Sequence, residues 1–410
     1  MQTNETISLQ SDVGRDSIAL ALSGGGSRAI AFHLGCLRAL KELQILDRVS
    51  TITAVSGGSV LAGMYCSHPG DFETFEREVR RVLAKGFVKP ALYTALTTTE
   101  GLKAIGYATT LFAERAVSFF VRRALKLCFI TIPKSQWPNV SPILRKASRT
   151  TILRNTFSKT FDGCMMKNLR KDRPRLIVIA CELRAKAAFY FTAECLHCWR
   201  YGSASSEGVE LAEAVVASAA YPAALPAIDQ CMTFNKNGEQ KSHRITLTDG
   251  GVYDNLGLAP LWPDRDPSIS MEVEPHDRII ACRAGYALEV AEPASIWPSR
   301  MEAAFESVFA RSQNFATKRL FDLAESGKLK GILLPYLGQQ DDKLQFATPD
   351  LVPGEMTAGY PTNFSAMDQE WIEKLVTRGE QLVYALVKEN WPEMSMPKKA
   401  DYLKKPNFVE

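Results

Sequence analysis

A serine at the end of a β-branched run is the clearest candidate for chemistry in this sequence. Ser56 follows Val49–Val55 (VSTITAV) and precedes two glycines, in the segment AVSGGS. A serine on a sharp strand-to-helix turn exposes its hydroxyl at the carboxyl end of a sheet, beside the amides of a helix N-terminus. Glycines after it allow the turn to stay tight. Ser56 is therefore predicted to be a nucleophile, with a plain structural turn as the alternative.

Three successive glycines follow an earlier apolar run. Gly24, Gly25 and Gly26 come after Ser17–Leu22 and lead into Ala29–Leu43, whose apolar residues have helical spacing. Such a turn can direct consecutive amides toward an anion, and the following helix adds the positive end of its dipole. The pattern predicts an oxyanion hole or a phosphate cradle, and a nucleotide-binding βαβ unit or simply a tight connection is the alternative. A dinucleotide site would need an acidic residue at the end of the second strand, where this chain has the candidate serine.

An aspartate in a D-G-G segment is the third candidate. Asp249 follows the apolar run Arg244–Thr248 (RITLT) and precedes two glycines. This spacing predicts a carboxylate at a strand end, where glycines let the backbone approach closely. An ordinary Asp-Gly turn is the alternative. Asp254 and Asn255 are predicted to be turn or capping residues.

A serine hydroxyl needs a base, and histidine is the usual one. The five histidines are His33, His68, His197, His243 and His276. None has a setting typical of a catalytic triad, because the first lies within a predicted helix and two others flank prolines. The simplest inference is then that Asp249 is the base for Ser56. A carboxylate is a weak base in water, so burial would have to raise its pKa.

Taken in order, these segments resemble the patatin-like phospholipase family, which has a G-G-G-x-R-G oxyanion motif, a G-x-S-x-G elbow and a D-G-G or D-G-A base motif. Gly24–Arg28 match the first motif, and Ala29 stands at its last glycine. Ser56 and Gly58 match the elbow, and Ala54 stands at its first glycine.

The resemblance extends from about residue 17 to residue 257. Asp249–Gly251 match the base motif, and Ala217–Pro226 (ASAAYPAALP) is similar to the family's alanine-rich helix and proline turn. The resemblance implies a Ser-Asp dyad, an acyl-serine intermediate and hydrolysis of (phospho)lipid acyl esters by water, without metal or cofactor. The enzyme would be a phospholipase A or a lysophospholipase. Arg28 would hold the oxyanion loop or meet an anionic head group.

Two other classes of function stay open. One is a nucleotide-binding α/β protein that uses the SGGGSR loop for phosphates. The other is a catalytically inactive, membrane-binding scaffold with the same fold.

Two consecutive strand–turn–helix units predict a parallel sheet covered by helices, because parallel neighbours need a crossover connection. Further strands are predicted at Arg175–Cys181, Ala188–Thr192, Arg244–Thr248, Arg278–Cys282 and Gly331–Pro335. The runs at 175 and 188 are close enough for a hairpin, so the sheet should be mixed. We expect an α/β fold, a three-layer sandwich with a mostly parallel central sheet and a helical insertion.

The domain organisation follows from the same pattern. Residues 1–16 are predicted to be a flexible N-terminus, and residues 17–391 one patatin-like α/β hydrolase domain. A helical insertion is expected at about 67–170, and helices near 295–326 and 368–389 close the domain. Residues 392–410 form a tail.

Composition limits the partners and the location. The chain has 49 basic and 45 acidic residues, and a net charge of +4 is too small to require a nucleic-acid partner. The N-terminus lacks the order of a secretory signal peptide, and charged residues interrupt the most apolar stretch, Ile105–Ile132. Nine cysteines, an odd number, are typical of a reduced protein. We expect a cytoplasmic protein with a lipid substrate and no nucleic acid; the oligomeric state stays open.

A basic amphipathic helix is predicted over Ala116–Ile130. Val117, Val121, Ala124 and Cys128 share one side of it, and Arg115, Arg122 and Lys126 share another. Such a helix can lie on an anionic membrane, so peripheral membrane contact is one prediction and packing on its own domain is the other.

The segment CLHC holds Cys195, His197 and Cys198. A zinc site needs a fourth ligand and usually a second ligand pair, and no C-x-x-C or H-x-x-x-H pair stands nearby. Structural cysteines are the prediction.

Overall fold

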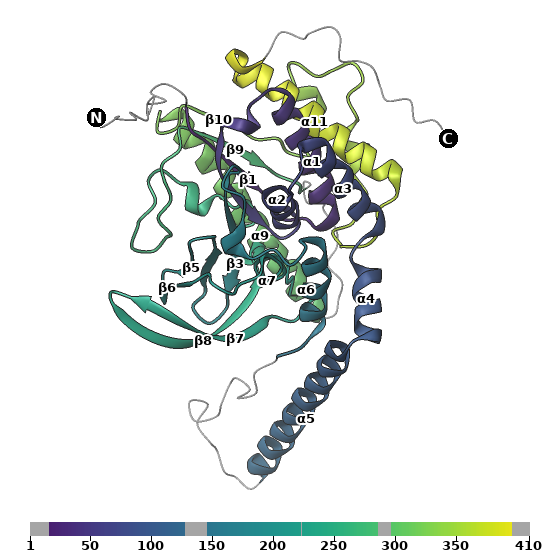
Figure 1. Cartoon of the computed structure of the whole chain (residues 1–410), viewed down its shortest axis with the longest axis vertical. Helices are drawn as coiled ribbons and strands as arrows, with labels where there is room; N and C mark the ends of the chain where they lie inside the picture. The colour runs from purple at the N-terminus through teal and green to yellow at the C-terminus, as the bar shows by residue number, and fades with distance from the viewer. Residues whose placement is uncertain (1–15, 128–145, 223, 286–296, 396–410) are drawn as a thin grey trace, which may run out of the picture.

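The computed structural model describes residues 16–127, 146–222, 224–285 and 297–395 (Figure 1). The predicted flexible N-terminus up to residue 15 and the predicted tail from residue 396 lie outside these residues. So does Cys128–Ile130, the end of the predicted amphipathic helix.

The parallel part of the sheet contains five strands in the order β10-β9-β1-β2-β3. Their bounds are β1 Ile18–Leu22, β2 Val49–Val55, β3 Arg175–Glu182, β9 Arg278–Cys282 and β10 Gly331–Leu333. Every neighbouring pair among them is parallel. These strands match the apolar runs of the sequence, because a parallel strand is covered on both faces and has few polar positions.

The other part of the sheet is antiparallel. Its strands are β4 Ala187–Phe191, β5 Cys195–Cys198, β6 Gly202–Ser205, β7 Ile228–Lys236 and β8 Glu239–Asp249. Each pairs with the next, and β8 also returns to pair with β3. The six strands from β3 to β8 therefore close on themselves.

The predicted three-layer sandwich with a mostly parallel central sheet was wrong. Within the described residues, six strand pairings are antiparallel and four are parallel. The cause is the length of the connections, because a parallel neighbour needs a crossover of a dozen or more residues. Asn237 and Gly238 join β7 to β8 with φ values of 54° and 85°, and positive φ at both positions is typical of a tight hairpin turn. The expected hairpin between the 175 and 188 runs is confirmed by the pairing of Val178 with Phe191.

Two apolar clusters form the core. Successive residues of a strand point to opposite faces, so Ile18, Leu20 and Leu22 belong to one cluster and Ala19 and Ala21 to the other. All five residues are fully buried. This double burial fixes β1 at the centre of the parallel strands.

Helices flank the sheet and fill the stretch where an insertion was predicted. The helices outside that stretch are α1 Gly26–Glu42, α2 Gly57–Ser67, α7 Leu211–Ser218, α8 Gly251–Asp254, α9 Trp297–Glu325, α10 Gly354–Ala358 and α11 Gln369–Asn390. Those between residues 67 and 170 are α3 Phe72–Lys85, α4 Val88–Thr97, α5 Thr99–Leu127 and α6 Arg149–Thr160. Short 3-10 turns lie at Leu46–Arg48, Met166–Asn168, Ala259–Leu261, Asp341–Lys343 and Pro392–Met394.

Helix α5 projects away from the body of the molecule, as Figure 1 shows. Its first turn is tied down where the Thr151 hydroxyl donates to the Glu100 carboxylate at 2.7 Å. Among the described residues, no helix combines the length and the apolar character needed to cross a membrane.

Candidate active site

Three strands end at one place, and each is followed by one of the predicted site segments. The glycine turn follows β1, Ser56 follows β2, and Asp249 is the last residue of β8. Val55 pairs with Ile179 of β3, and Asp249 pairs with the next residue, Ala180. Because β4 occupies the other edge of β3, β2 and β8 share one edge and meet there end to end. The closure of the antiparallel strands thus brings Asp249 to Ser56.

Ser56 lies in a strained turn. Its φ of 50° and ψ of −120° are outside the regions that most residues adopt, at a cost of about 1–3 kcal/mol. The surroundings hold it there, since its N–H donates to the Ser218 hydroxyl at 2.9 Å and that hydroxyl donates to the Ile179 carbonyl at 2.6 Å. The Ser56 side chain stands at the N-terminus of α2 with 8% of its surface exposed.

Asp249 is buried beside Ser56. Its carboxylate accepts a hydrogen bond from the Gly251 amide at 2.7 Å, and the Ser56 hydroxyl lies near enough to act on its pKa. Burial raises the pKa of Asp249 to about 7, although both of these neighbours act to lower it. A carboxyl with a pKa near neutrality can accept and return a proton under physiological conditions. The structure therefore brings together the two residues of the predicted dyad, and their catalytic roles stay a prediction.

The glycine turn presents two backbone amides. The Gly24 amide donates to the Asn255 carbonyl at 3.2 Å, which holds the turn against the segment after Asp249. Among the described residues, the amides of Gly25 and Gly26 donate to no protein acceptor. Both residues have positive φ, 148° and 59°, a conformation that favours glycine. Of the three glycines predicted to form an oxyanion hole, Gly25 and Gly26 are therefore the two whose amides can donate to a ligand.

Arg28 anchors the turn from outside. Its guanidinium donates to the Ala284 carbonyl at 2.9 Å and to the Tyr360 carbonyl at 3.1 Å. These bonds join α1 to two distant loops. Of the two roles expected for Arg28, they support the holding of the loop.

A short segment between α10 and α11 packs on the glycine turn. The Ser27 amide donates to the Asn363 carbonyl at 2.7 Å, and a Cβ atom on Gly26 would lie 2.4 Å from the same oxygen. One residue further on, the Phe364 carbonyl accepts from the Phe87 amide at 2.9 Å. The segment therefore contacts the site on one side and the junction of α3 and α4 on the other.

The elbow and the glycine turn touch through atoms of the backbone. A Cβ atom on Gly57 would lie 2.2 Å from the Gly26 carbonyl oxygen, and one on Gly58 would lie 2.4 Å from the Leu22 carbonyl oxygen. We expect Gly58→Ala to separate the two turns, to lower the melting temperature and to reduce ester turnover at least about a hundredfold, because small misplacements of reacting groups cost that much. Calorimetry and steady-state kinetics would measure both effects.

Gly106→Ala is the matched control for that substitution. No atom lies within 4 Å of a Cβ atom at Gly106 in α5, and alanine stabilises a helix interior by about 1 kcal/mol relative to glycine. Equal turnover in the Gly58→Ala and Gly106→Ala variants would contradict the packing argument.

Two residues of the site were not predicted from the sequence to have a part in it. Ser218 bridges Ser56 and β3, and the Gly250 amide donates to its carbonyl at 3.1 Å. Asn255 was predicted as a turn residue, yet a Cβ atom on Gly24 would lie 2.5 Å from its side-chain oxygen. The signal available for Ser218 was a hydroxyl at the end of an alanine-rich helix.

The other candidates lie apart from this chemistry. The described residues include all five histidines, and none of these hydrogen-bonds with Ser56 or Asp249. Asp254 is a turn residue, one of its two predicted roles, because its carboxylate accepts from the Gly257 and Ala259 amides. Cys198 is buried in the core of β5, while His197, on the other face of the strand, is hydrogen-bonded to the Ser203 hydroxyl at 3.1 Å.

Comparison with known proteins agrees with the site motifs. A family model described as patatin-like phospholipase matches residues 20–262, more than half of the chain. No curated protein matches the sequence. Among solved structures, human GIVD cytosolic phospholipase A2 is 13% identical with a TM-score of 0.52, and the match covers 91% of this chain and 59% of that chain. That likeness shows a related fold, over about three fifths of the human protein.

Two further structures resemble the chain less well. The human enzyme in complex with methyl gamma-linolenyl fluorophosphonate is 18% identical with a TM-score of 0.30, and the match covers 46% of this chain and 24% of that chain. VipD from Legionella pneumophila is 12% identical with a TM-score of 0.38, and the match covers 92% of this chain and 67% of that chain.

Proposed function

Because the chain belongs to the patatin-like phospholipase family, we propose that it cleaves acyl esters of phospholipids or lysophospholipids through an acyl-serine at Ser56. Membership of this family supports the activity of a lipid acyl hydrolase. Asp249 is the general base of the proposal, and the amides of Gly25 and Gly26 bind the oxyanion. One observation carries it, the placement of the Ser56 hydroxyl beside the buried carboxyl of Asp249, whose pKa is about 7.

In the first half-reaction, the Ser56 oxygen attacks the ester carbonyl carbon and its proton passes to Asp249. The carbonyl oxygen becomes an oxyanion, which the two amides stabilise together with the positive end of the α1 dipole. The bond between the carbonyl carbon and the alcohol oxygen then breaks. Asp249 returns the proton to the leaving alcohol, and the acyl group stays on Ser56.

In the second half-reaction, water attacks the acyl-serine. Asp249 takes one proton from the water as its oxygen bonds to the acyl carbon, and the same amides stabilise the second oxyanion. The bond from the acyl carbon to the Ser56 oxygen breaks, and the proton returns to that oxygen. A fatty acid leaves and the enzyme is restored.

A fluorophosphonate ester tests the nucleophile directly, because its phosphorus is attacked by an activated serine. We expect one equivalent of label per active chain, and mass spectrometry should locate it on the peptide that contains Ser56. Labelling of another serine, or none in a folded and active sample, would exclude the assignment. Lipid profiling of vesicles incubated with the protein would then identify the acyl position and head group.

The pH dependence follows from the state of Asp249. Only the deprotonated carboxylate can accept the serine proton, and the pKa of Asp249 is about 7. We expect kcat/KM to rise about tenfold per pH unit below this pKa and to level off above it. Stopped assays with an ester that is stable across the range would measure the profile, and circular dichroism would confirm that the protein stays folded. A profile that is flat through pH 7 would argue against Asp249 as the base.

The remaining predictions from the sequence belong to the same proposal. The odd number of cysteines supports a cytoplasmic enzyme, and a lipid substrate implies contact with a membrane surface or a micelle. Residues 17–391 would form one hydrolase domain, with the helical insertion at about 67–170.

A further inference from the structure

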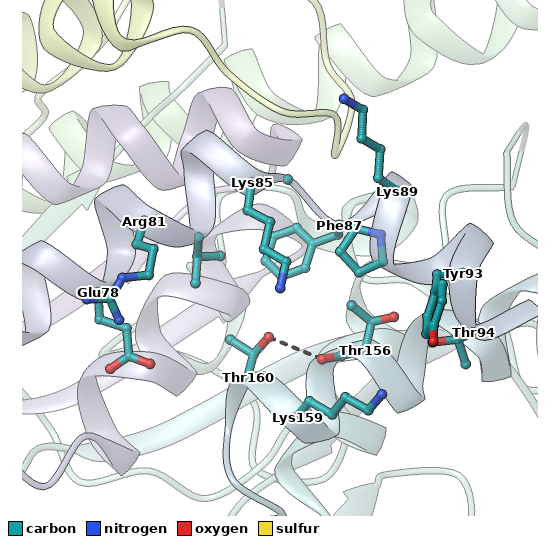
Figure 2. Close-up of a pocket in the computed structure, with 13 residues that line it drawn as sticks. Glu78, Arg81, Lys85, Phe87, Lys89, Tyr93, Thr94, Thr156, Lys159 and Thr160 are labelled. Atoms are coloured by element: carbon teal, nitrogen blue, oxygen red, sulfur yellow. Dashed lines mark hydrogen bonds between the residues drawn. The ribbon is translucent and has the colours of Figure 1, made fainter. Parts of the chain in front are cut away.

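A basic cavity lies outside the active site, where α3, α4 and α6 meet (Figure 2). Its volume is about 690 Å³, and its lining contains Arg81, Lys85, Lys89 and Lys159. In Figure 2 the side chains of Lys85 on α3 and Lys159 on α6 reach the cavity from opposite sides. Neither Ser56 nor Asp249 lines it.

The basic side chains in the lining of this cavity outnumber the acidic ones by four to one. The acidic residue in the lining, Glu78, pairs with His68 at 3.1 Å. Within the part of the chain that the structure describes, Arg81 and the three lysines form no ion pair. Threonine side chains, including Thr156 and Thr160, complete the polar part of the lining. Several ammonium groups and a guanidinium around one space are suited to a phosphate-bearing ligand, while the Thr160 hydroxyl donates to the Thr156 carbonyl of its own helix.

Exposed apolar side chains continue from this cavity along α4. Val88, Leu92 and Leu96 recur every four residues, so they share one face of the helix, and Leu96 is 78% exposed. Tyr93, which lines the cavity, is 67% exposed. Helix α4 packs on α6 and leads into α5. The basic cavity and the exposed apolar face of α4 are therefore next to each other.

Helix α5 extends this apolar surface. Ile105, Phe112 and Phe119 recur every seven residues and thus lie on one side, and Phe112 is 75% exposed. Leu102 and Phe120 are exposed beside them. The helix is about 43 Å long at 1.5 Å per residue, and it projects from the body (Figure 1). A flat surface can therefore contact α5 without covering the rest of the molecule.

We propose that the cavity and the exposed faces of α4 and α5 form a docking surface for an anionic phospholipid bilayer. The cavity binds a phosphate-bearing head group, while the leucine and phenylalanine side chains enter the acyl region. Basic groups next to exposed aromatic and aliphatic side chains are complementary to such a membrane, which is negative at its surface and apolar below. The proposal deepens the proposed function, resting on it for a lipid substrate, and places the enzyme on that lipid.

Vesicle binding by the full chain tests the docking surface. Ser56→Ala protein, which should leave the lipids intact, is sedimented with vesicles of phosphatidylcholine alone or mixed with phosphatidylserine. We expect stronger binding to the mixed vesicles, and the difference should shrink as salt is added. Lys85→Glu with Lys159→Glu should weaken that binding at least about twentyfold, since each lysine near an anionic surface contributes about fivefold.

The apolar part has its own variants. Phe112→Asp and Phe119→Asp should each weaken binding about tenfold or more, because a buried phenylalanine side chain contributes at least that factor. Matched controls are Lys241→Glu with Lys318→Glu, and Ile269→Asp, which change exposed residues outside this surface. The controls should bind as the parent does.

Several outcomes would overturn the docking surface. They are equal binding to neutral and anionic vesicles, no binding to either, or binding by the cavity and phenylalanine variants equal to that of the controls. The hydrolase activity is measured separately, in protein that retains Ser56, as the turnover of a soluble short-chain ester without vesicles. Failure of docking would leave that turnover intact, whereas failure of the proposed function would abolish turnover and leave vesicle binding.

Discussion

Replacing Ser56 by alanine is expected to lower the turnover of an acyl ester by about a thousandfold or more, because the change removes the oxygen that forms the proposed acyl intermediate. The change removes one oxygen from a side chain that is already at the edge of the core, with 8% of its surface exposed. The Ser56 amide would still donate to Ser218, so the elbow should keep its shape and the melting temperature should change little.

Steady-state hydrolysis of a fluorogenic acyl ester would measure the effect. Ser67→Ala is the matched control, since Ser67 lies at the far end of α2 and its hydroxyl donates to the Gly63 carbonyl. The control should retain nearly full turnover. Full turnover by Ser56→Ala itself would eliminate this residue as the nucleophile.

Replacing Asp249 by asparagine is expected to have an effect of similar size. The amide cannot accept the serine proton, and residues that act as one unit each cost about as much as the pair. Its oxygen can still accept from the Gly251 amide. A double variant with Ser56→Ala should then be hardly slower than either single variant.

The Asp249→Asn substitution should lower turnover but should not lower the stability of the folded protein. Burial raises the pKa of Asp249 from 3.8 to about 7, so the folded protein favours the neutral carboxyl. This stabilising contribution is complete below about pH 4 and is lost as the pH rises through 7. At pH 8 the Asp249→Asn variant, whose amide side chain is permanently neutral, should have a melting temperature at least as high as that of the parent. A lower melting temperature together with lost turnover would point to a structural role for Asp249.

The catalytic candidates could be predicted because their signals are local. A β-branched run that ends in a serine and glycines specifies an elbow, and three glycines before a helix specify a turn with exposed amides. The positions of Ser56 and Asp249 relative to each other are a different matter. They depend on β8 reaching the edge of β3 where β2 ends, which no spacing in the sequence reveals.

The antiparallel strands explain why the fold was predicted only in part. The segments CLHC and GSAS of β5 and β6 are short and lack a strong apolar alternation. The Asn237-Gly238 pair was a usable hairpin signal, and it would have predicted β7 and the extended β8. The contacts of Ser218 and Asn255 in the site could not be predicted from the sequence, because they join distant segments.

The segment from Asn363 to Phe364 has a thermodynamic consequence for the whole protein. It touches the glycine turn through one carbonyl and the α3–α4 junction through the next, and the Phe364 ring packs against Phe87, which lines the basic cavity. A ligand that moves this junction therefore acts on the same segment whose backbone contacts Gly26. Linkage is reciprocal, so whatever factor a head group applies to the affinity for an oxyanion mimic, the mimic applies to the affinity for the head group.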